Sequence, residues 1–296
     1  MNAGRVAVRF SLMMAFAWAA TSAWAGGPSE LRKQVEASMV LTGSVDVAQD
    51  GSVRRYELDH PEQIDPVVLD FVERNIRSWS FDVGSLPAVI SPTATIRNSM
   101  SILVVAKAID DKTYSLRLVG SNFNAVNPEP GTRLRHAKMT PPTYPQAAAA
   151  ARVKGRVYVM VKVGRNGVVE DAIAEQVNLG VVARNEIEMK RWRKMLAASA
   201  LGAVKQWKFV YPTRGEQADE PFIVARVRVE YSLRPGTEAK YGEWAPYVPG
   251  PRQSNPWESA DANPGFSPDA LAAVDGIYSN DGLRLKTPLQ ATVDGS

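Results

Sequence analysis

The part of the sequence that decides the fold runs from Gly155 to Val169 and reads Gly155-Arg156-Val157-Tyr158-Val159-Met160-Val161-Lys162-Val163-Gly164-Arg165-Asn166-Gly167-Val168-Val169. Valine alternates with polar or larger residues from Val157 to Val163, which is the period of a half-buried β-strand. Asn166-Gly167 is a dipeptide typical of a tight hairpin turn. The stretch therefore predicts a strand, a turn and a returning antiparallel strand.

A helix and a last strand complete this unit. Residues 186–206 have apolar side chains at helical spacing and lead to Trp207-Lys208-Phe209. Further on, one face of a strand is apolar and the other polar, with Ile223, Ala225, Val227, Val229, Tyr231 and Leu233 alternating with Arg226, Arg228, Glu230 and Ser232. Such alternation is typical of an antiparallel strand buried on one face. The order ββαβ predicts a small antiparallel sheet with one packed helix, an α+β fold.

An earlier segment repeats this order of signals. Residues 42–47 alternate at strand period before Asp50-Gly51, a second hairpin dipeptide. Asp65-Pro66 predicts a helix start that leads to Trp79-Ser80-Phe81. Two tandem copies of one unit are therefore indicated, with chance similarity of two amphipathic units as the alternative. Asp110-Asp111-Lys112 predicts a further hairpin in the first copy.

The segment from Pro142 to Leu233 resembles the C-terminal domain of the TonB family. The resemblance is carried by Tyr144-Pro145-x-x-Ala148, by the alternating valines and Asn166-Gly167, by Ala200-x-x-x-Val204-x-x-Trp207-x-Phe209-x-x-Pro212, and by the alternating last strand. It implies a periplasmic module of a Gram-negative cell envelope that adds an extended segment of an outer-membrane receptor to a sheet edge. An unpaired edge offers backbone donors and acceptors to such a segment.

If the resemblance transfers, the partner binds along the last strand and at its entry. The candidate partner-binding residues are Tyr144, Pro145, Val224, Arg226, Arg228 and Glu230. Arg226 and Arg228 are expected to point outward and to meet an acidic partner. For Tyr144-Pro145 the alternative is that the pair simply fixes an extended chain before a short helix, because a residue before proline avoids the helical region.

The resemblance and the changes in composition divide the chain into five parts. We expect a signal peptide over residues 1–25, a degenerate TonB C-terminal-like domain over 26–125, a linker over 126–140, a TonB C-terminal-like domain over 141–235, and a largely irregular Pro- and Gly-rich tail over 236–296. The two folded domains are each expected to be a small antiparallel sheet with one helix.

The N-terminus predicts export. Arg5 and Arg9 precede an apolar run, and Ser22-Ala23-Trp24-Ala25 supplies small residues at a cleavage site. We expect a cleaved signal peptide and a periplasmic protein, with an uncleaved inner-membrane anchor that faces the periplasm as the alternative. TonB itself keeps such an anchor and a long Pro- and Lys-rich spacer, which this sequence lacks. A binding protein is therefore favoured over an energy transducer.

Composition excludes several other functions. The chain of 296 residues has no Cys and two His, which removes thiol chemistry and His- or Cys-rich metal sites. A net charge of +4 does not indicate nucleic-acid binding. The basic run Lys190-Arg191-Trp192-Arg193-Lys194 is interpreted as a solvated helix face, with binding of an anionic polymer as the alternative.

No catalytic motif appears, so we expect a non-catalytic protein without cofactor or metal. Its expected partner is a protein or peptide of the cell envelope. A structural homo-oligomer stays open, since exposed edges of small sheets invite self-pairing. An enzyme that acts on an envelope polymer ranks last, because only export and scattered aromatic residues favour it.

Overall fold

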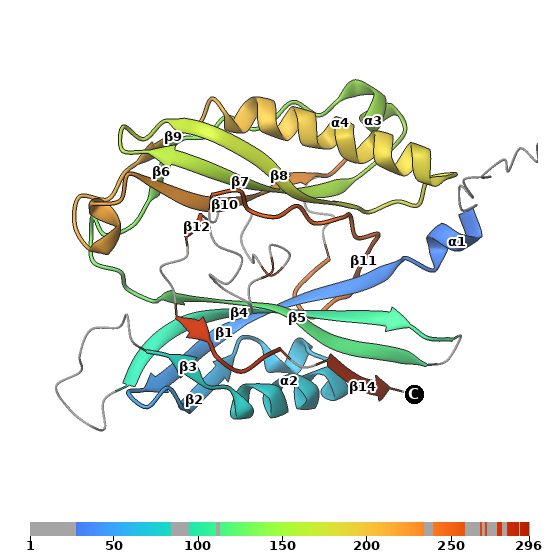
Figure 1. Ribbon diagram of the computed structural model, residues 1–296. Helices are drawn as coiled ribbons and strands as arrows, with labels where there is room; N and C mark the ends of the chain where they lie inside the picture. Colours follow the sequence, from blue (N-terminus) through green and yellow to red (C-terminus); the bar gives the residue numbers. More distant parts are fainter. Residues whose placement is uncertain are drawn as a thin grey trace, which may run out of the picture.

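The computed structural model describes residues 28–83, 95–110, 113–233, 239–257, 267, 270, 277–279, 283–289 and 291–295. These residues form an α+β protein, with mostly antiparallel strands in several small sheets and few helices. Two larger sheets face each other, and each carries one long helix on its outer side (Figure 1). We call them the first unit and the second unit. The expected signal peptide lies outside the described residues.

The first unit is a six-stranded sheet in the order β11-β1-β4-β5-β14, with β2 also paired to β1. Its strands are β1 (Glu36–Ala48), β2 (Val53–Leu58), β4 (Thr95–Ala108), β5 (Tyr114–Ala125), β11 (Ala245–Tyr247) and β14 (Ala291–Gly295). The short helix α1 (Pro28–Arg32) precedes the sheet, and a 3₁₀ turn, η1 (Pro61–Gln63), follows β2. The predicted hairpins β1–β2 and β4–β5 are both confirmed.

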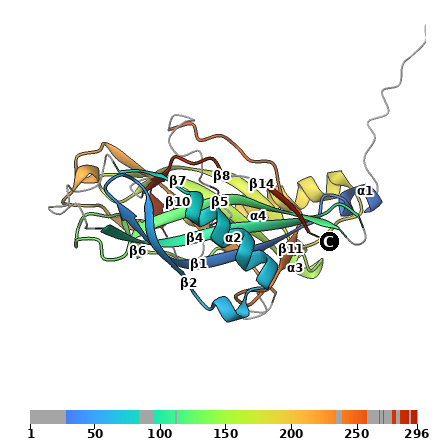
Figure 2. The same cartoon turned by 90° about the horizontal axis from the view of Figure 1, so that it is seen from below.

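Helix α2 (Pro66–Ser78) covers the outer face of the first sheet. Figure 2 shows the helix running obliquely across the strands of this sheet. It begins where the sequence predicts, because the Asp65 carboxylate accepts a hydrogen bond from the Val67 N–H at 2.8 Å. Its buried residues, Val68, Phe71, Val72 and Ile76, recur at helical spacing. They pack on the side chains of β1, β4 and β5 that face the helix.

The second unit is a four-stranded sheet in the order β12-β10-β7-β8. Its elements are α3 (Gln146–Ala150), β7 (Gly155–Gly164), β8 (Val169–Leu179), α4 (Glu186–Val204), a 3₁₀ turn η2 (Glu216–Ala218), β10 (Phe222–Tyr231) and β12 (Tyr278–Ser279). Asn185 caps α4 by accepting from the Glu188 N–H at 2.9 Å. The alternating valines of β7 face α4 and form the core with Leu196, Ala200 and Val204.

In both units, the glycine of the first hairpin turn contacts the phenylalanine that follows the long helix. The Phe81 N–H donates to the Gly51 carbonyl at 2.8 Å, and the Phe209 N–H donates to the Gly167 carbonyl at 2.9 Å. Both glycines have positive φ, 82° and 72°. A Cβ would lie 2.3 Å from the Phe81 oxygen at Gly51 and 2.0 Å from the Phe209 oxygen at Gly167. Only glycine fits this turn, and the same geometry occurs in both units.

The strands after the two helices are β3 (Phe81–Asp82) and β9 (Lys208–Val210), and each has one partner strand. In the second unit, β9 pairs with β6 (Arg135–Lys138), which lies in the range expected to be a linker. In the first unit, β3 pairs with β13 (Arg284–Leu285), which belongs to the C-terminal tail.

The tail contains short strands that the sequence analysis did not locate. Its described residues place β11 on β1, β12 on β10, β13 on β3 and β14 on β5. Strands of two to five residues on an existing edge need no apolar alternation of their own. Much of the described tail lies between the two units, which face each other across it (Figure 1). Among the described residues, no helix has the length and apolar character to span a membrane.

Candidate functional site

The candidate site is the outer edge of β10. One side of β10 pairs with β7 over its whole length, from Phe222 to Tyr231. Its other side pairs with the tail at two positions, Ala225 with Ser279 and Arg226 with Tyr278. Within the described ranges, no strand lies against this outer side from Val227 to Tyr231. β10 is therefore a border strand of which one short part is covered by the same chain.

Arg226 lies elsewhere than the sequence analysis expected. Its side chain is buried, and its Nε is 3.1 Å from Oε2 of Glu175, which belongs to β8. Oε1 of Glu175 accepts hydrogen bonds from Arg252 of the tail, at 3.0 Å from Nε and 2.8 Å from Nη2. The carboxylate of Glu175 therefore lies between Arg226 of β10 and Arg252 of the tail. These two guanidinium groups compensate its buried charge. Nothing in the sequence distinguishes Glu175 from a solvated strand residue.

Arg228 and Glu230 belong to a second cluster on the same face of the sheet. Glu230 lies opposite Arg156 of β7, whose Nε is 3.0 Å and 3.3 Å from the two carboxylate oxygens. The Arg228 Nε is 3.9 Å from Oε2 of Glu230. All three side chains are partly buried, with 24%, 12% and 17% exposure for Arg156, Arg228 and Glu230. A partner at this face meets a charge cluster that is already partly paired.

Tyr144 and Pro145 lie at the far end of β10. The Tyr144 hydroxyl donates to the Val153 carbonyl at 2.6 Å, and its ring packs edge-on against Tyr231 with 5.4 Å between centroids. Burial raises the pKa of both phenols. Pro145 is the N-cap residue of α3. The structure thus brings Tyr144 to the end of the candidate edge, while Val224 lies near its start, opposite Lys162.

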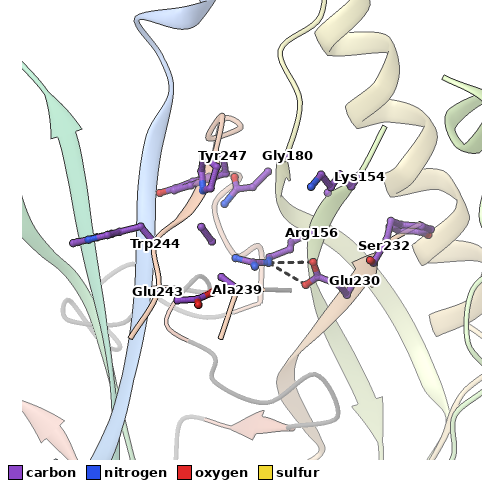
Figure 3. A pocket seen from close by; sticks show the side chains of 14 residues that line it. Lys154, Arg156, Gly180, Glu230, Ser232, Ala239, Glu243, Trp244 and Tyr247 are labelled. Carbon is purple, nitrogen blue, oxygen red and sulfur yellow. Dashed lines mark hydrogen bonds and ion pairs between the residues drawn. The ribbon is translucent and has the colours of Figure 1, made fainter. Parts of the chain in front are cut away.

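A cavity of about 320 Å³ opens beside this end of β10 (Figure 3). It lies between the second sheet and the tail, and the tail contributes Glu243, Trp244 and Tyr247. Arg156 stands in it with its ion pair to Glu230 drawn as dashed lines. Sequence reasoning missed this cavity, because it forms only where the tail docks on the sheet.

The candidate edge offers backbone pairing and charged side chains. Within the described part of the chain, no cluster of three or more His, Cys, Asp or Glu residues is able to hold a metal ion. The polar groups at the site include ion-paired guanidinium and carboxylate side chains and the amides of a strand edge, and the cavity adds Lys154, Asn178 and Glu243. Such groups suit recognition of an extended chain.

Comparisons with known proteins found no match to this chain. No protein-family model matches the chain, no curated protein matches it, and no solved structure matches it. The function therefore rests on the residues and their geometry.

Proposed function

We propose that the chain is a non-catalytic binding protein of the cell envelope that recognises an extended peptide of an envelope or outer-membrane partner by strand addition to β10. In this proposal the two units are tandem ββαβ domains that resemble the TonB C-terminal domain. The shared contact of Gly51 with Phe81 and of Gly167 with Phe209 supports their origin by duplication. The second unit carries the partner site, and the first is the degenerate copy.

The observation that carries the proposal is the pairing of β10 with β12. The outer side of β10 already pairs with the backbone of Tyr278 and Ser279 in an antiparallel arrangement, so this edge is able to hold an added antiparallel strand. A contact of two residue pairs is small beside the ten pairs that join β10 to β7. A longer partner strand is therefore able to extend along Val227–Tyr231 or to displace β12.

Side chains beside the edge supply selectivity. Successive side chains of an added strand point to opposite faces of the sheet. On one face they meet the cluster of Arg156, Arg228 and Glu230, and on the other they approach the helix side, where Tyr231 packs on Tyr144. We therefore expect a partner segment that alternates polar and apolar residues. Because Arg226 is engaged by Glu175, it contributes to this face by supporting the sheet rather than by meeting the partner.

The proposed location is the periplasm, after removal of residues 1–25 as a signal peptide. The alternative is a membrane-anchored energy transducer that keeps these residues. Mass spectrometry of the mature N-terminus distinguishes the two. A chain that starts near Gly26 supports the periplasmic protein, whereas Met1–Ala25 in the membrane fraction supports the transducer.

Capture of partners from an envelope extract tests strand addition. Arg228→Pro and Val229→Pro are compared, because successive amides of a strand alternate sides and only one of the two faces the outer edge. Leu233→Pro is the matched control, since Leu233 is exposed and lies beyond the end of β10. We expect the proline that faces outward to leave the protein folded by circular dichroism and to reduce capture. Undiminished capture by both folded variants contradicts the proposal.

A further inference from the structure

A groove of about 460 Å³ lies between helix α4 and the outer edge of β8, on the border of the second sheet opposite to β10. Its helical wall is one stripe of α4 at spacings of three and four residues, formed by Lys194, Ala197, Ala198 and Leu201. Its strand side is formed by the segment from Ala172 to Val177. The two alanines leave space beside the strand that a longer side chain would fill.

The edge of β8 already holds an extended segment over part of its length. Leu179 and Val248 exchange two backbone hydrogen bonds, at 3.1 Å and 2.8 Å, and the Gln253 N–H donates to the Glu175 carbonyl at 2.7 Å. Two residues further on, the Asn255 side chain accepts from the Trp257 N–H at 2.9 Å, which marks a local turn of the tail. The tail lines one end of the groove with Pro251 and Gln253, beside Gln176 and Val177 of β8, and the groove continues from there toward Ala172.

Beyond that point the β8 edge is open to a new strand. From Glu170 to Ala174, the described residues contribute no strand to its outer side. The Ala172 N–H is bonded to the neighbouring Asp171 carboxylate at 2.8 Å, an acceptor that an incoming backbone carbonyl is able to replace. Because the edge continues one on which the tail is already seated, a second extended segment fits in line with the first.

The end of the groove near the tail is cationic. Arg193 lines it and is only 8% exposed, and its Nε has no hydrogen-bond partner. Its Nη2 donates to the Pro249 carbonyl at 3.1 Å, and its Nη1 is 3.6 Å from Oε1 of Glu186. Burial lowers the pKa of Arg193, and the Glu186 carboxylate partly opposes that shift. Lys194 is exposed on the rim, and none of the ion pairs between described residues involves it.

From these contacts we infer a second peptide site, in the groove between α4 and β8. Its ligand is an extended segment of a partner protein that adds a strand to β8. The segment places apolar side chains over Ala197, Ala198 and Leu201, and a carboxylate side chain beside Lys194. This site goes beyond the proposed function, because it lies on the opposite border of the sheet from β10 and does not depend on pairing there.

Fluorescence anisotropy with a defined peptide tests the site on the full mature chain. The probe is fluorescein-labelled Ser-Glu-Thr-Val-Thr-Leu-Thr-Val-Ser, in which one face of the extended chain carries Glu, Val, Leu and Val. A second peptide has Lys in place of Glu. We expect the Glu peptide to bind and the Lys peptide to bind at least about tenfold more weakly, since a like charge faces Lys194.

Variants locate the binding. Ala198→Trp fills the groove from an exposed helix position and is expected to abolish binding, whereas Lys194→Glu is expected to weaken it about tenfold and to reverse the preference between the two peptides. Lys205→Glu makes the same charge change at the exposed end of α4, outside the groove, and is expected to leave binding within about twofold.

The β10 variants of the capture experiment separate this inference from the proposed function. Binding that persists in whichever of the Arg228→Pro and Val229→Pro variants stays folded, but disappears in Ala198→Trp, supports the groove. Absence of binding to the wild-type chain overturns the inference, as does binding that survives Ala198→Trp. Binding lost only in the β10 variants also overturns it, and then supports the β10 site.

Discussion

The two units have the same turn and helix-end geometry but are completed by different parts of the chain. In the second unit, β9 pairs with β6, which immediately precedes that unit. In the first unit, β3 pairs with β13 from the C-terminal tail, and Ser80 bonds to Thr287 across 207 residues of sequence. The tail therefore supplies the partner of β3 in the first unit, whereas in the second unit the tail pairs with the edges of β8 and β10 and adds Val248 to the core.

The two completing segments also resemble each other in sequence. Leu134-Arg135 is followed by Lys138 and then by Thr140-Pro141, and Leu283-Arg284-Leu285-Lys286 is followed by Thr287-Pro288. Each threonine lies beside the Trp-x-Phe strand: Trp207 donates to the Thr140 carbonyl at 2.8 Å, and the Ser80 N–H donates to the Thr287 hydroxyl at 2.8 Å. The C-terminal segment thus takes the position in the first unit that residues 134–141 take in the second.

The largest expected effect comes from deleting residues 283–296. This removes β13 and β14 and the buried side chains of Leu283 and Leu285, so we expect the first unit to lose about 3–6 kcal/mol of stability. The second unit keeps β6 and is expected to stay folded. Urea unfolding followed by tryptophan fluorescence and near-UV circular dichroism measures this. Deletion of 291–296 alone, which keeps β13, is the control. A truncated chain that unfolds like the wild type contradicts the comparison.

Glu175→Gln is expected to destabilise the second unit by about 3–5 kcal/mol, because Arg226 is left buried with its charge uncompensated. The substitution also weakens the hydrogen bonds between Arg252 and residue 175, and therefore the docking of the tail on the sheet. The matched control is Glu170→Gln, whose ion pair with Lys162 is partly exposed and should contribute no more than about 1 kcal/mol. Equal effects of the two substitutions in chemical denaturation would refute the buried cluster.

Gly51→Ala and Gly167→Ala test whether the two turns are equivalent. Each substitution forces a Cβ against a phenylalanine carbonyl at positive φ, so each is expected to cost about 1–3 kcal/mol. Gly202→Ala on α4 is the control with the opposite sign, since its Cβ meets no atom within 4 Å and alanine favours the helix by about 1 kcal/mol. If only one turn glycine is sensitive, the duplicated geometry is not a shared requirement.

The smallest expected effect is a loss of stability in alkali. Burial raises the pKa of Tyr231 in the second unit and of Tyr241 in the tail above the ordinary tyrosine value of 10.0. The folded state therefore keeps these protons longer than the unfolded state, and stability present below pH 10 falls as pH rises further. Tyr231→Phe is expected to flatten this fall, and to cost about 1 kcal/mol near pH 7 through its lost bond to Leu196. If the melting temperature of Tyr231→Phe falls above pH 10 as steeply as that of the wild type, Tyr231 is not the source of the loss of stability.

The elements that sequence predicts are those with a strong local signal. Both hairpin glycines, the Asp65 cap and the alternation along β7 and β10 specify their own geometry through backbone conformation and side-chain period. The four short strands of the tail carry no such signal, because their pairing depends on edges made elsewhere in the chain.

The candidate site shows the same division. The alternating strand and the resemblance to the TonB C-terminal domain predict a site at β10, but they do not predict the direction of the Arg226 side chain. Arg226 meets Glu175, which is the extra β8 residue at the irregularity between Tyr158 and Val159 in the β7–β8 pairing, and no local sequence pattern predicts this irregularity. The groove beside α4 depends on where the tail leaves β8, which no local pattern of the sequence indicates.

Residue-resolved amide hydrogen exchange, measured with and without the captured envelope partner, tests strand addition to β10 most directly. Partner binding should slow exchange at the outward-facing amides between Val227 and Tyr231 and leave the amides of α4 unchanged. Partner binding without any change along β10 would contradict the proposed function.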